Sequence, residues 1–424
     1  MRRFLFWSLC FCLLFPVGLS SCDGSDSAAV IFGGTTGKLT WTLTEDGVLT
    51  ITGEGPMPDY RDGGTSETPP WYPHVNRISS LTIGEGVTRI GDYAFMLCSF
   101  VTEVVIPESV TSMGDWAFWH CQSLKRITFP DRMVRFGEWA FYENESLQSV
   151  CIPEGVTTIP SSAFARCHNL TCVIMPGSLQ TICGGAFSQC HKLTDVTIPD
   201  GVTVIETGAF KSCPITSIEI PASVETIEAA AFKGCLALAK ITFEKGINLK
   251  KISGGYSENR NTDGYFYGHG AFAKCTALTS IEIPASVEVI EPEAFWGCSA
   301  LITVSFEHES QLKIIQGSYE KIYVGHSPNG YNRYYRSGGF RGLANLTTFD
   351  ASNCSQIESI EPSAFYHCSK LQSVKVGTMI PPTCGIDAFS ELNSYTILTV
   401  PKESIEAYKQ ANEWKNFTNI TALN

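Results

Sequence analysis

Residues 278–298 read LTSIEIPASVEVIEPEAFWGC, and this stretch contains the features that decide the fold. Its first part, 278–284, alternates apolar and polar residues and is rich in β-branched side chains, which is typical of a short β-strand. The proline at 284 closes that strand where a ladder N–H is no longer needed. A second extended piece follows, and the segment ends in Ala-Phe-x-x-Cys at 294–298, which we interpret as one helical turn.

The same pattern recurs along most of the chain. Between the first seven copies the repeat Phe recurs every 23 residues, and once after 22. The twelve copies of this residue are Phe95, Phe118, Phe141, Phe164, Phe187, Phe210, Phe232, Phe272, Phe295, Phe340, Phe365 and Phe389. No unit can bury its apolar face alone, whereas stacked units share one core. The sequence therefore predicts an α/β repeat solenoid of about twelve units, with a parallel sheet on one face.

The consensus Leu-x-x-Ile-x-Ile-Pro-x-x-Val-x-x-Ile-x-x-x-Ala-Phe-x-x-Cys resembles the leucine-rich repeats of the BspA-like bacterial surface proteins. The resemblance extends from about residue 80 to 392. It implies a leucine-rich-repeat superhelix displayed at the cell surface. It also implies adhesion to a host or bacterial surface protein, or to a glycan.

Both flanks of the repeats predict caps, because the end units of a solenoid would otherwise expose core. Residues 39–43 and 48–52, joined across Glu45-Asp46-Gly47, are typical of an N-terminal β-hairpin. A strand at 398–401 and a short amphipathic helix from 404 to 414 resemble the family's terminal unit. The predicted organisation is a signal peptide at 1–21, a tether at 22–32, an N-terminal β cap at 33–79, a repeat solenoid at 80–392 with insertions at 253–271 and 316–339, and a C-terminal strand-helix cap at 393–424.

The first residues are typical of an export signal. Arg2 and Arg3 precede an apolar run at 4–19 that is too short for a comfortable bilayer span. Leu19-Ser20-Ser21-Cys22 resembles the lipobox of bacterial lipoproteins, which implies lipidation of Cys22. The acidic residues that follow resemble surface-export signals of Bacteroidetes lipoproteins. We therefore expect an exported protein, lipid-anchored to the outer membrane and facing outside; the alternative is an ordinary secretory peptide with a cysteine near its cleavage site.

Charge argues against a nucleic-acid partner. The chain has 30 Lys and Arg against 42 Asp and Glu, a net charge of −12. Cleavage before Cys22 would remove two Arg and bring the charge to −14. Nucleic-acid-binding proteins show a basic patch or stripe instead.

Most of the 17 cysteines follow the repeat. Two leave with the signal peptide, Cys22 takes lipid, and nine stand three residues after the repeat Phe. These nine, the ladder cysteines, are Cys98, Cys121, Cys167, Cys190, Cys213, Cys235, Cys275, Cys298 and Cys368. Other units have Asn144, Leu343 or Leu392 in that slot, so we interpret it as a buried position rather than a metal ligand or nucleophile. Cys151 and Cys172 are predicted two residues out of register, roughly 8 Å apart, which is too far for an unstrained disulfide.

The outward strand positions predict no active site. Thr and Ser dominate them, and no register gathers His with carboxylates or a Ser-His-Asp group. His168 and His191 are expected side by side as two solvated histidines rather than as a metal site. We expect no enzyme activity, no cofactor and no metal.

Two insertions are the best functional lead. The five-residue step from the second Ile to the repeat Phe grows to 20 residues at 252–272 and to 25 at 315–340. Both insertions enter at the same repeat position, so they should emerge from one edge, with roots roughly 10 Å apart. Their Tyr and Arg side chains are of the kind that binding surfaces use. The candidate binding residues are Tyr256, Tyr265 and Tyr267 in the first insertion and Tyr319, Tyr323, Tyr331, Tyr334, Tyr335, Arg333 and Arg336 in the second.

The main hypothesis is a lipid-anchored surface protein that binds a macromolecule, protein or glycan, and that meets the membrane only through its lipid. One alternative is a surface component of glycan capture whose tyrosines stack on sugars. Another is a structural envelope or spacer protein without a specific ligand. In that last case the insertions would fold back over an apolar edge, or would be tolerated decoration.

Overall fold

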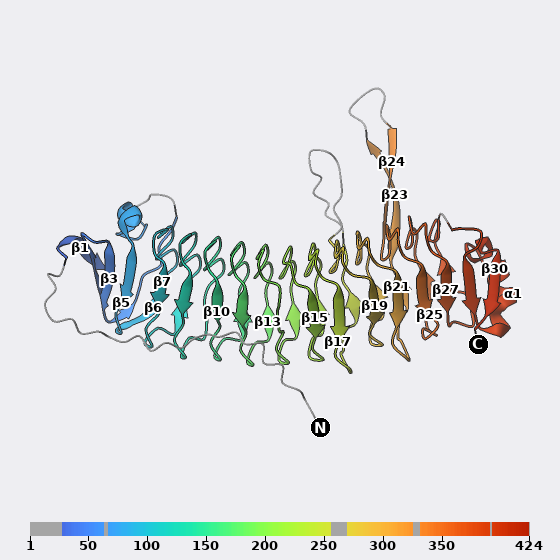
Figure 1. Cartoon of the computed structure of the whole chain (residues 1–424), viewed down its shortest axis with the longest axis horizontal. Coiled ribbons are helices and arrows are strands. Elements are labelled where there is room, and N and C mark those ends of the chain that lie inside the picture. Colours follow the sequence, from blue (N-terminus) through green and yellow to red (C-terminus); the bar gives the residue numbers. More distant parts are fainter. Residues whose placement is uncertain (1–27, 63–66, 256–268, 325–330, 391, 424) are drawn as a thin grey trace.

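The chain forms a long rod of stacked units with a cap at each end (Figure 1). The computed structural model describes residues 28–62, 67–255, 269–324, 331–390 and 392–423. Most units contribute strands to two files that run along the rod, and the repeat strands that pair within each file do so in parallel. This confirms the predicted parallel-sheet solenoid.

The first file holds the strand that precedes the conserved proline. Its strands are β5 (Ser80–Ile83), β7 (Glu103–Val105), β9 (Arg126–Thr128), β10 (Ser149–Cys151), β12 (Cys172–Ile174), β15 (Ser217–Ile220), β17 (Lys240–Phe243), β19 (Ser280–Ile283), β21 (Thr303–Phe306), β25 (Thr348–Ala351), β27 (Ser373–Val376) and β29 (Ile397–Val400).

The second file holds the shorter extended piece that ends at the second Ile. Its strands are β4 (Gly55–Pro56), β6 (Val87–Ile90), β8 (Ser112–Met113), β11 (Thr158–Ile159), β13 (Thr181–Ile182), β14 (Val204–Ile205), β16 (Thr226–Ile227), β18 (Lys251–Ile252), β20 (Val289–Ile290), β22 (Ile314–Ile315), β26 (Ser359–Ile360) and β28 (Thr383–Cys384).

Side-chain alternation explains why the first file is buried on one face only. In β19, Ile281 and Ile283 are buried, whereas Glu282 between them is exposed. Successive strands keep this register, so that Glu282 lies opposite Ser305 of β21. A period of two therefore sends one set of residues into the core of every unit.

The twelve repeat Phe residues form a continuous column through the core. Neighbouring ring centroids lie 4.9 to 5.8 Å apart along its whole length. Trp71 stacks on Phe95 at one end, and Trp414 contacts Phe389 at the other. The indole N–H groups of these two tryptophans donate to the carbonyls of Ala94 and Pro382. A buried aromatic column with a tryptophan at each end accounts for the caps that a solenoid requires.

The Ala-Phe segment is not the helical turn that the sequence suggested. In the first unit Tyr93 and Leu97 have φ of 55° and 62°, and most units repeat this left-handed backbone two residues before and two after the Phe. Because left-handed residues alternate with residues of ordinary backbone, every second peptide N–H group points along the axis of the rod. The N–H groups of Tyr93, Phe95 and Leu97 thus donate to carbonyls of the next unit at 2.8–2.9 Å. The N–H groups of Met96 and Cys98 stay within the unit and donate to carbonyls three residues earlier at 3.3–3.4 Å. The segment is therefore a series of tight turns joined to the next unit rather than a helical turn.

The ladder cysteines pack as buried residues, as predicted, and also donate hydrogen bonds. The thiol of Cys213 lies 3.0 Å from the carbonyl oxygen of Phe187, the repeat Phe of the preceding unit. Six further ladder cysteines make the same bond at 3.1–3.2 Å and Cys275 makes it at 3.4 Å. Burial raises the pKa of Cys121 well above its ordinary value, which keeps this thiol protonated and able to donate.

The remaining cysteines lie in individual surroundings. Cys172 pairs with Ser149 and Cys151 with Ile174, which confirms that the two cysteines are two residues out of register. Cys354 is buried, while Cys183 and Cys384 are half-buried.

Both caps are larger than predicted. The expected hairpin of β2 (Leu39–Thr44) and β3 (Val48–Gly53) is present, and β3 pairs in parallel with β5. An additional strand, β1 (Val30–Thr36), pairs with β2 and begins inside the range predicted as tether. A 3-10 helix, η1 (Tyr72–Arg77), follows Trp71.

At the other end, the only α-helix of the described residues is α1 (Ile405–Gln410). It is flanked by the 3-10 turns η2 (Lys402–Ser404) and η3 (Trp414–Asn416), and β30 (Asn419–Ala422) pairs in parallel with β29. The predicted strand-helix cap is confirmed, with one further strand.

Candidate functional site

The second insertion forms a β-hairpin that projects from one edge of the rod (Figure 1). Its strands are β23 (Gly317–Val324) and β24 (Tyr331–Gly338), paired antiparallel without a bulge. The edge from which it projects, the turn edge, is formed by the residues between each second-file strand and the ladder position three residues after the repeat Phe. The two insertions follow β18 and β22, which are separated by β20 alone. Their roots therefore lie two strands apart, as predicted.

Only part of the predicted binding set can be placed. Tyr319 and Arg336 are described in full. The backbones of Tyr323, Tyr331, Arg333, Tyr334 and Tyr335 lie on the hairpin strands, but their side chains are outside the described part of the chain. Cys22, Tyr256, Tyr265 and Tyr267 lie outside the described residues altogether.

Arg336 fixes the base of the hairpin to the following units. It lies opposite Tyr319 in the hairpin register, with its guanidinium 5.2 Å from the Tyr319 ring centroid. The same guanidinium lies 4.2 Å from the centroid of Tyr366 and donates to Asp387 at 2.7 Å. Its side chain is only 24% exposed. We therefore assign Arg336 a positioning role, because its partners on the next two units define the direction of the hairpin.

Two glycines and a buried glutamate occupy the turn edge at the bases of the two insertions and between them. A Cβ at Gly270 would lie 1.9 Å from the carbonyl oxygen of Glu293, and one at Gly338 would lie 2.3 Å from that of Ser363, so neither position has room for a side chain. Glu293 donates its N–H to the Gly338 carbonyl at 3.0 Å and pairs with Arg341 at 3.1 Å. Its side chain is 4% exposed. Burial raises the pKa of Glu293 to about 7, although Arg341 opposes the shift.

The turn edge also carries an aromatic cluster that sequence reasoning missed. It consists of Tyr93, Trp116, Trp119, Trp139 and Tyr142, all half-buried. Tyr93, Trp116 and Trp139 stand two residues before the repeat Phe in successive units. Tyr93 and Trp116 stack 5.9 Å apart at 3°, and Trp116 and Trp139 stack 4.8 Å apart at 5°. A comparison of this one column across units would have found them, because no later unit has an aromatic residue there.

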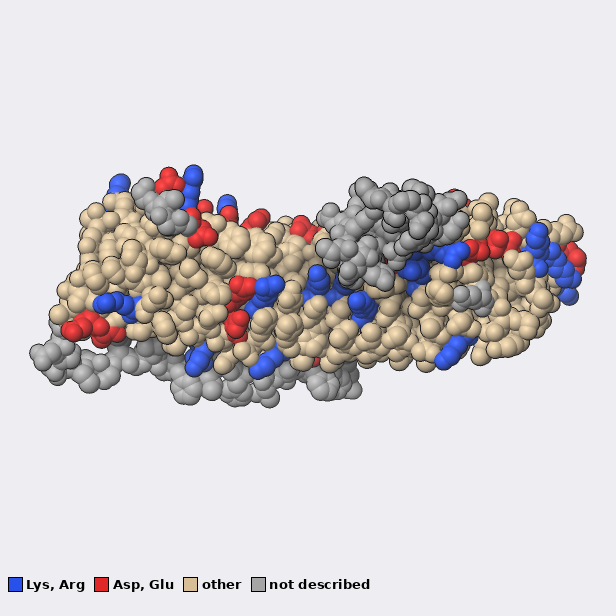
Figure 2. Space-filling model, turned by 90° about the horizontal axis from the view of Figure 1, so that it is seen from above, with Lys and Arg blue, Asp and Glu red and all other residues tan. Residues whose placement is uncertain are grey.

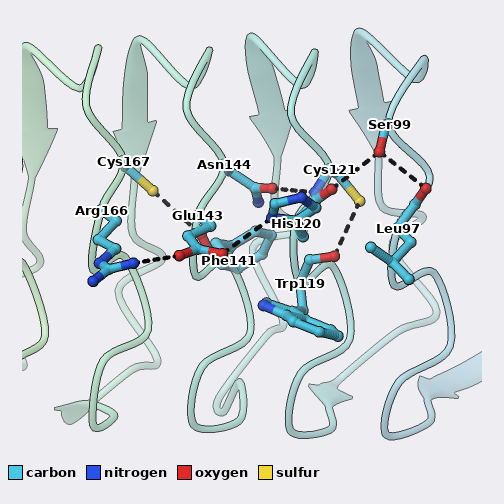
Figure 3. A network of polar contacts seen from close by, with 10 residues as sticks. All are labelled: Leu97, Ser99, Trp119, His120, Cys121, Phe141, Glu143, Asn144, Arg166 and Cys167. Atoms are coloured by element: carbon cyan, nitrogen blue, oxygen red, sulfur yellow. Dashed lines mark hydrogen bonds and ion pairs between the residues drawn. The ribbon is translucent and has the colours of Figure 1, made fainter. Parts of the chain in front are cut away.

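A polar network borders the aromatic cluster (Figure 3). Glu143 accepts from Arg166 at 2.6 Å and lies 3.1 Å from the Nδ1 atom of His120. The Arg166 guanidinium also lies 5.7 Å from the Tyr142 ring centroid. These three charged or titratable residues occupy one repeat position in successive units, which is why the solenoid brings them together. The network orients these three side chains with respect to one another.

The middle of the turn edge is basic. Figure 2 looks onto this edge, and Lys and Arg side chains gather along its central part. Burial, together with the charges of Lys211 and Lys274, lowers the pKa of Lys233 to about 8. In an acidic chain this local reversal of charge gives the edge a character that differs from the remainder of the surface.

The histidines lie as expected. His168 and His191 stack with ring centroids 4.7 Å apart. Burial and the neighbouring His168 lower the pKa of His191. Within the described ranges, no group of three His, Cys, Asp or Glu side chains could hold a metal ion.

No helix among the described residues has the length and apolar character to cross a bilayer.

Comparisons with known proteins identify the repeats. The family described as "BspA type Leucine rich repeat region" matches this chain in six copies at residues 72–193, 157–261, 266–321 and 333–424. No curated protein sequence matches the chain.

Several solved structures are similar. A leucine rich cell surface protein from Faecalibacterium prausnitzii is 26% identical, with a TM-score of 0.44, over 95% of this chain and 96% of that one. A leucine-rich repeat protein from Eubacterium ventriosum is 23% identical, with a TM-score of 0.46, over 86% and 95%. One from Bacteroides ovatus is 20% identical, with a TM-score of 0.48, over 93% and 100%. The matched repeats cover most of the chain, which therefore belongs to the BspA-type leucine-rich repeat family.

Proposed function

We propose that this chain is a bacterial surface protein that binds a macromolecule through its turn edge, held to the outer membrane by lipid on Cys22. The hairpin β23–β24 carries the proposal. It projects from the rod, and Arg336, Asp387 and Tyr366 hold its base in one direction. A projecting element with a fixed base loses little conformational freedom on binding, which favours affinity. The name of the relative from F. prausnitzii, a cell surface protein, supports the location.

The partner is a protein or glycan at a host or bacterial surface. The hairpin sequence is rich in Tyr and Arg, which dominate binding hot spots. A purely structural spacer would need no such element. The basic middle of the turn edge further favours a partner that presents acidic groups.

A hairpin replacement tests this function. Residues 316–339 are replaced by the four residues that join Ile205 to Phe210 in a regular unit. The unit then returns to consensus length, so the thermal transition should change by a few degrees at most. Binding to a panel of fibronectin, laminin, collagen, mucin and bacterial polysaccharides is measured by biolayer interferometry. The function requires that at least one member binds the native chain and that the replacement removes this binding. Equal binding by both chains would refute the role of the hairpin.

The lipid anchor is tested separately. Cys22→Ala should release the protein from the membrane fraction and abolish incorporation of labelled palmitate. Retention in the membrane without label would contradict the anchor but would leave the binding edge unaffected.

A further inference from the structure

We propose that a cleft between the N-terminal cap and the first repeat unit binds a neutral glycan. This cap cleft has a volume of about 940 Å³, within the range of ligand sites. Tyr60, Pro70, Asp59, Asp92 and Tyr93 are among the residues that line it. It lies at the N-terminal end of the rod, away from the hairpin (Figure 1), so it goes beyond the function proposed above.

Tyr93 contributes an aromatic residue to the lining of the cap cleft. Tyr93 begins the stack that continues through Trp116 and Trp139. Trp116 covers one face of the Tyr93 ring, and Tyr93 is among the residues that line the cleft. Rings inside a stack have both faces occupied, so a flat ligand can only stack at an end. The C–H face of a pyranose packs well on such a ring because it is flat and apolar.

Polar groups of the same cleft suit hydroxyls. The Asp59 carboxylate accepts the N–H of Asp92 at 3.0 Å, and the Asp92 carboxylate accepts the N–H of Asp115 at 3.0 Å. Both carboxylates are therefore oriented by the backbone, and each keeps lone pairs for further donors. Paired sugar hydroxyls are donors of the right kind.

Arg89 decides between a neutral and a cationic ligand. Its guanidinium pairs with Asp59 and, at 3.2 Å, with Asp92. A second ion pair, Arg61 with Glu67 at 3.0 Å, lies on the cleft rim. The two carboxylates already have a cation between them, so a ligand amine would compete with a guanidinium that the protein supplies. An uncharged hydroxyl can donate to a free lone pair of either carboxylate without displacing the Arg89 guanidinium.

The floor of the cap cleft is fixed before any ligand arrives. The Tyr60 hydroxyl lies 2.6 Å from the Thr36 hydroxyl, and the Tyr60 ring meets the edge of Trp71 at 5.7 Å. Trp71 in turn stacks on Phe95, the first ring of the core column. A site tied in this way to the core needs little ordering on binding, which favours even weak individual contacts.

Affinity gels and calorimetry test the proposal on the full chain. The probes are cellohexaose, maltohexaose, xylohexaose, mannohexaose and neutral mucin O-glycans. We expect at least one probe to bind, with affinity that changes less than twofold between 50 and 500 mM NaCl. Tyr93→Ala should weaken binding at least tenfold and Tyr93→Phe less than threefold, because the ring is retained. Asp59→Asn, which keeps an acceptor but loses charge, should weaken it a fewfold, and the hairpin replacement should have no effect.

Three results would overturn the assignment. The first is that none of the probes binds the native chain. The second is that Tyr93→Ala binds like the native chain while its far-UV spectrum is unchanged. The third is salt-sensitive binding of decalysine to the same cleft, abolished by Asp59→Asn, which would make the site cationic. Because the hairpin is untouched in these variants, failure here is distinguishable from failure of the proposed surface function.

Discussion

The regular units and the units that carry insertions share one core but differ at the turn edge. From Phe95 to Phe232 the rings of the column lie 5.2 to 5.6 Å apart. Across the insertions, from Phe232 to Phe340, the spacing is 5.5 to 5.8 Å. Lengthening the five-residue step to 20 or 25 residues thus leaves the column almost unchanged, because both ends of each insertion return to the hydrogen bonds of a regular unit. The core carries stability, and the edge is free to carry function.

The largest expected effect tests whether the two kinds of unit really share one core. Phe187→Ala lies in a regular unit and Phe340→Ala in an inserted one, and both rings are fully buried. Each substitution should lower the free energy of unfolding by about 3–5 kcal/mol, measured by urea denaturation. The two losses should agree within about 1 kcal/mol. A much smaller loss at Phe340 would show that the inserted unit is loosely packed.

Glu293, which lies between the bases of the two insertions, should make the free energy of unfolding depend on pH. Its pKa rises from 4.5 to about 7 on folding, so the unfolded carboxyl ionises first as pH increases. The contribution of Glu293 to the free energy of unfolding is therefore complete below about pH 4.5. It falls by up to about 3 kcal/mol as the pH rises to about 7. Glu293→Gln should remove this decline in urea denaturation at pH 4.5, 5.5 and 7.5. The matched control Glu282→Gln, on the exposed strand row, should retain the decline; loss of it in the control would contradict the assignment.

The thiol hydrogen bonds predict a smaller difference within the regular units. Cys213 donates to Phe187, whereas Cys98 belongs to the first unit and has no repeat Phe before it. Cys213→Ala should cost about 1 kcal/mol more than Cys98→Ala, since both lose the same packing but only one loses the bond. Chemical denaturation measures both. Equal costs would mean that the thiols act only as apolar filling.

The smallest effect concerns the anchoring of the hairpin. Arg336→Ala should reduce global stability by less than about 1 kcal/mol, because the ion pair is partly exposed. It should nevertheless speed hydrogen exchange in β23 and β24. Lys375→Ala, which removes an ion pair with Asp350 on the strand face, is the matched control and should leave hairpin exchange unchanged. If hydrogen exchange in β23 and β24 stays as slow as in the native protein in both variants, Arg336 does not fix the position of the hairpin.

Periodicity was sufficient to predict the rod, because a strict repeat of apolar residues constrains stacking. It located all twelve rings of the column, both caps and the common edge of the insertions. It could not predict the left-handed backbone of residues such as Trp116 and His120, since non-glycine residues rarely adopt it and only neighbouring units stabilise it here. The expected helical turn was wrong for that reason.

The functional surface was harder to predict than the fold. The insertions stand out by length, so the hairpin was found. The aromatic cluster has regular spacing and ordinary length, and its meaning depends on how rings in three units stack. The cap cleft depends on Tyr60 and Pro70, which lie outside the repeats and meet Tyr93 only through folding.

The central claim is that the turn edge, rather than the strand face, binds the ligand. Its most direct test compares three full-length chains against one captured partner by biolayer interferometry. They are the native protein, the hairpin replacement, and a chain with Thr128→Lys and Glu282→Lys on the strand face. The account predicts that the hairpin replacement loses binding at least tenfold while the strand-face variant binds within twofold of the native protein. Loss of binding in the strand-face variant alone would contradict it.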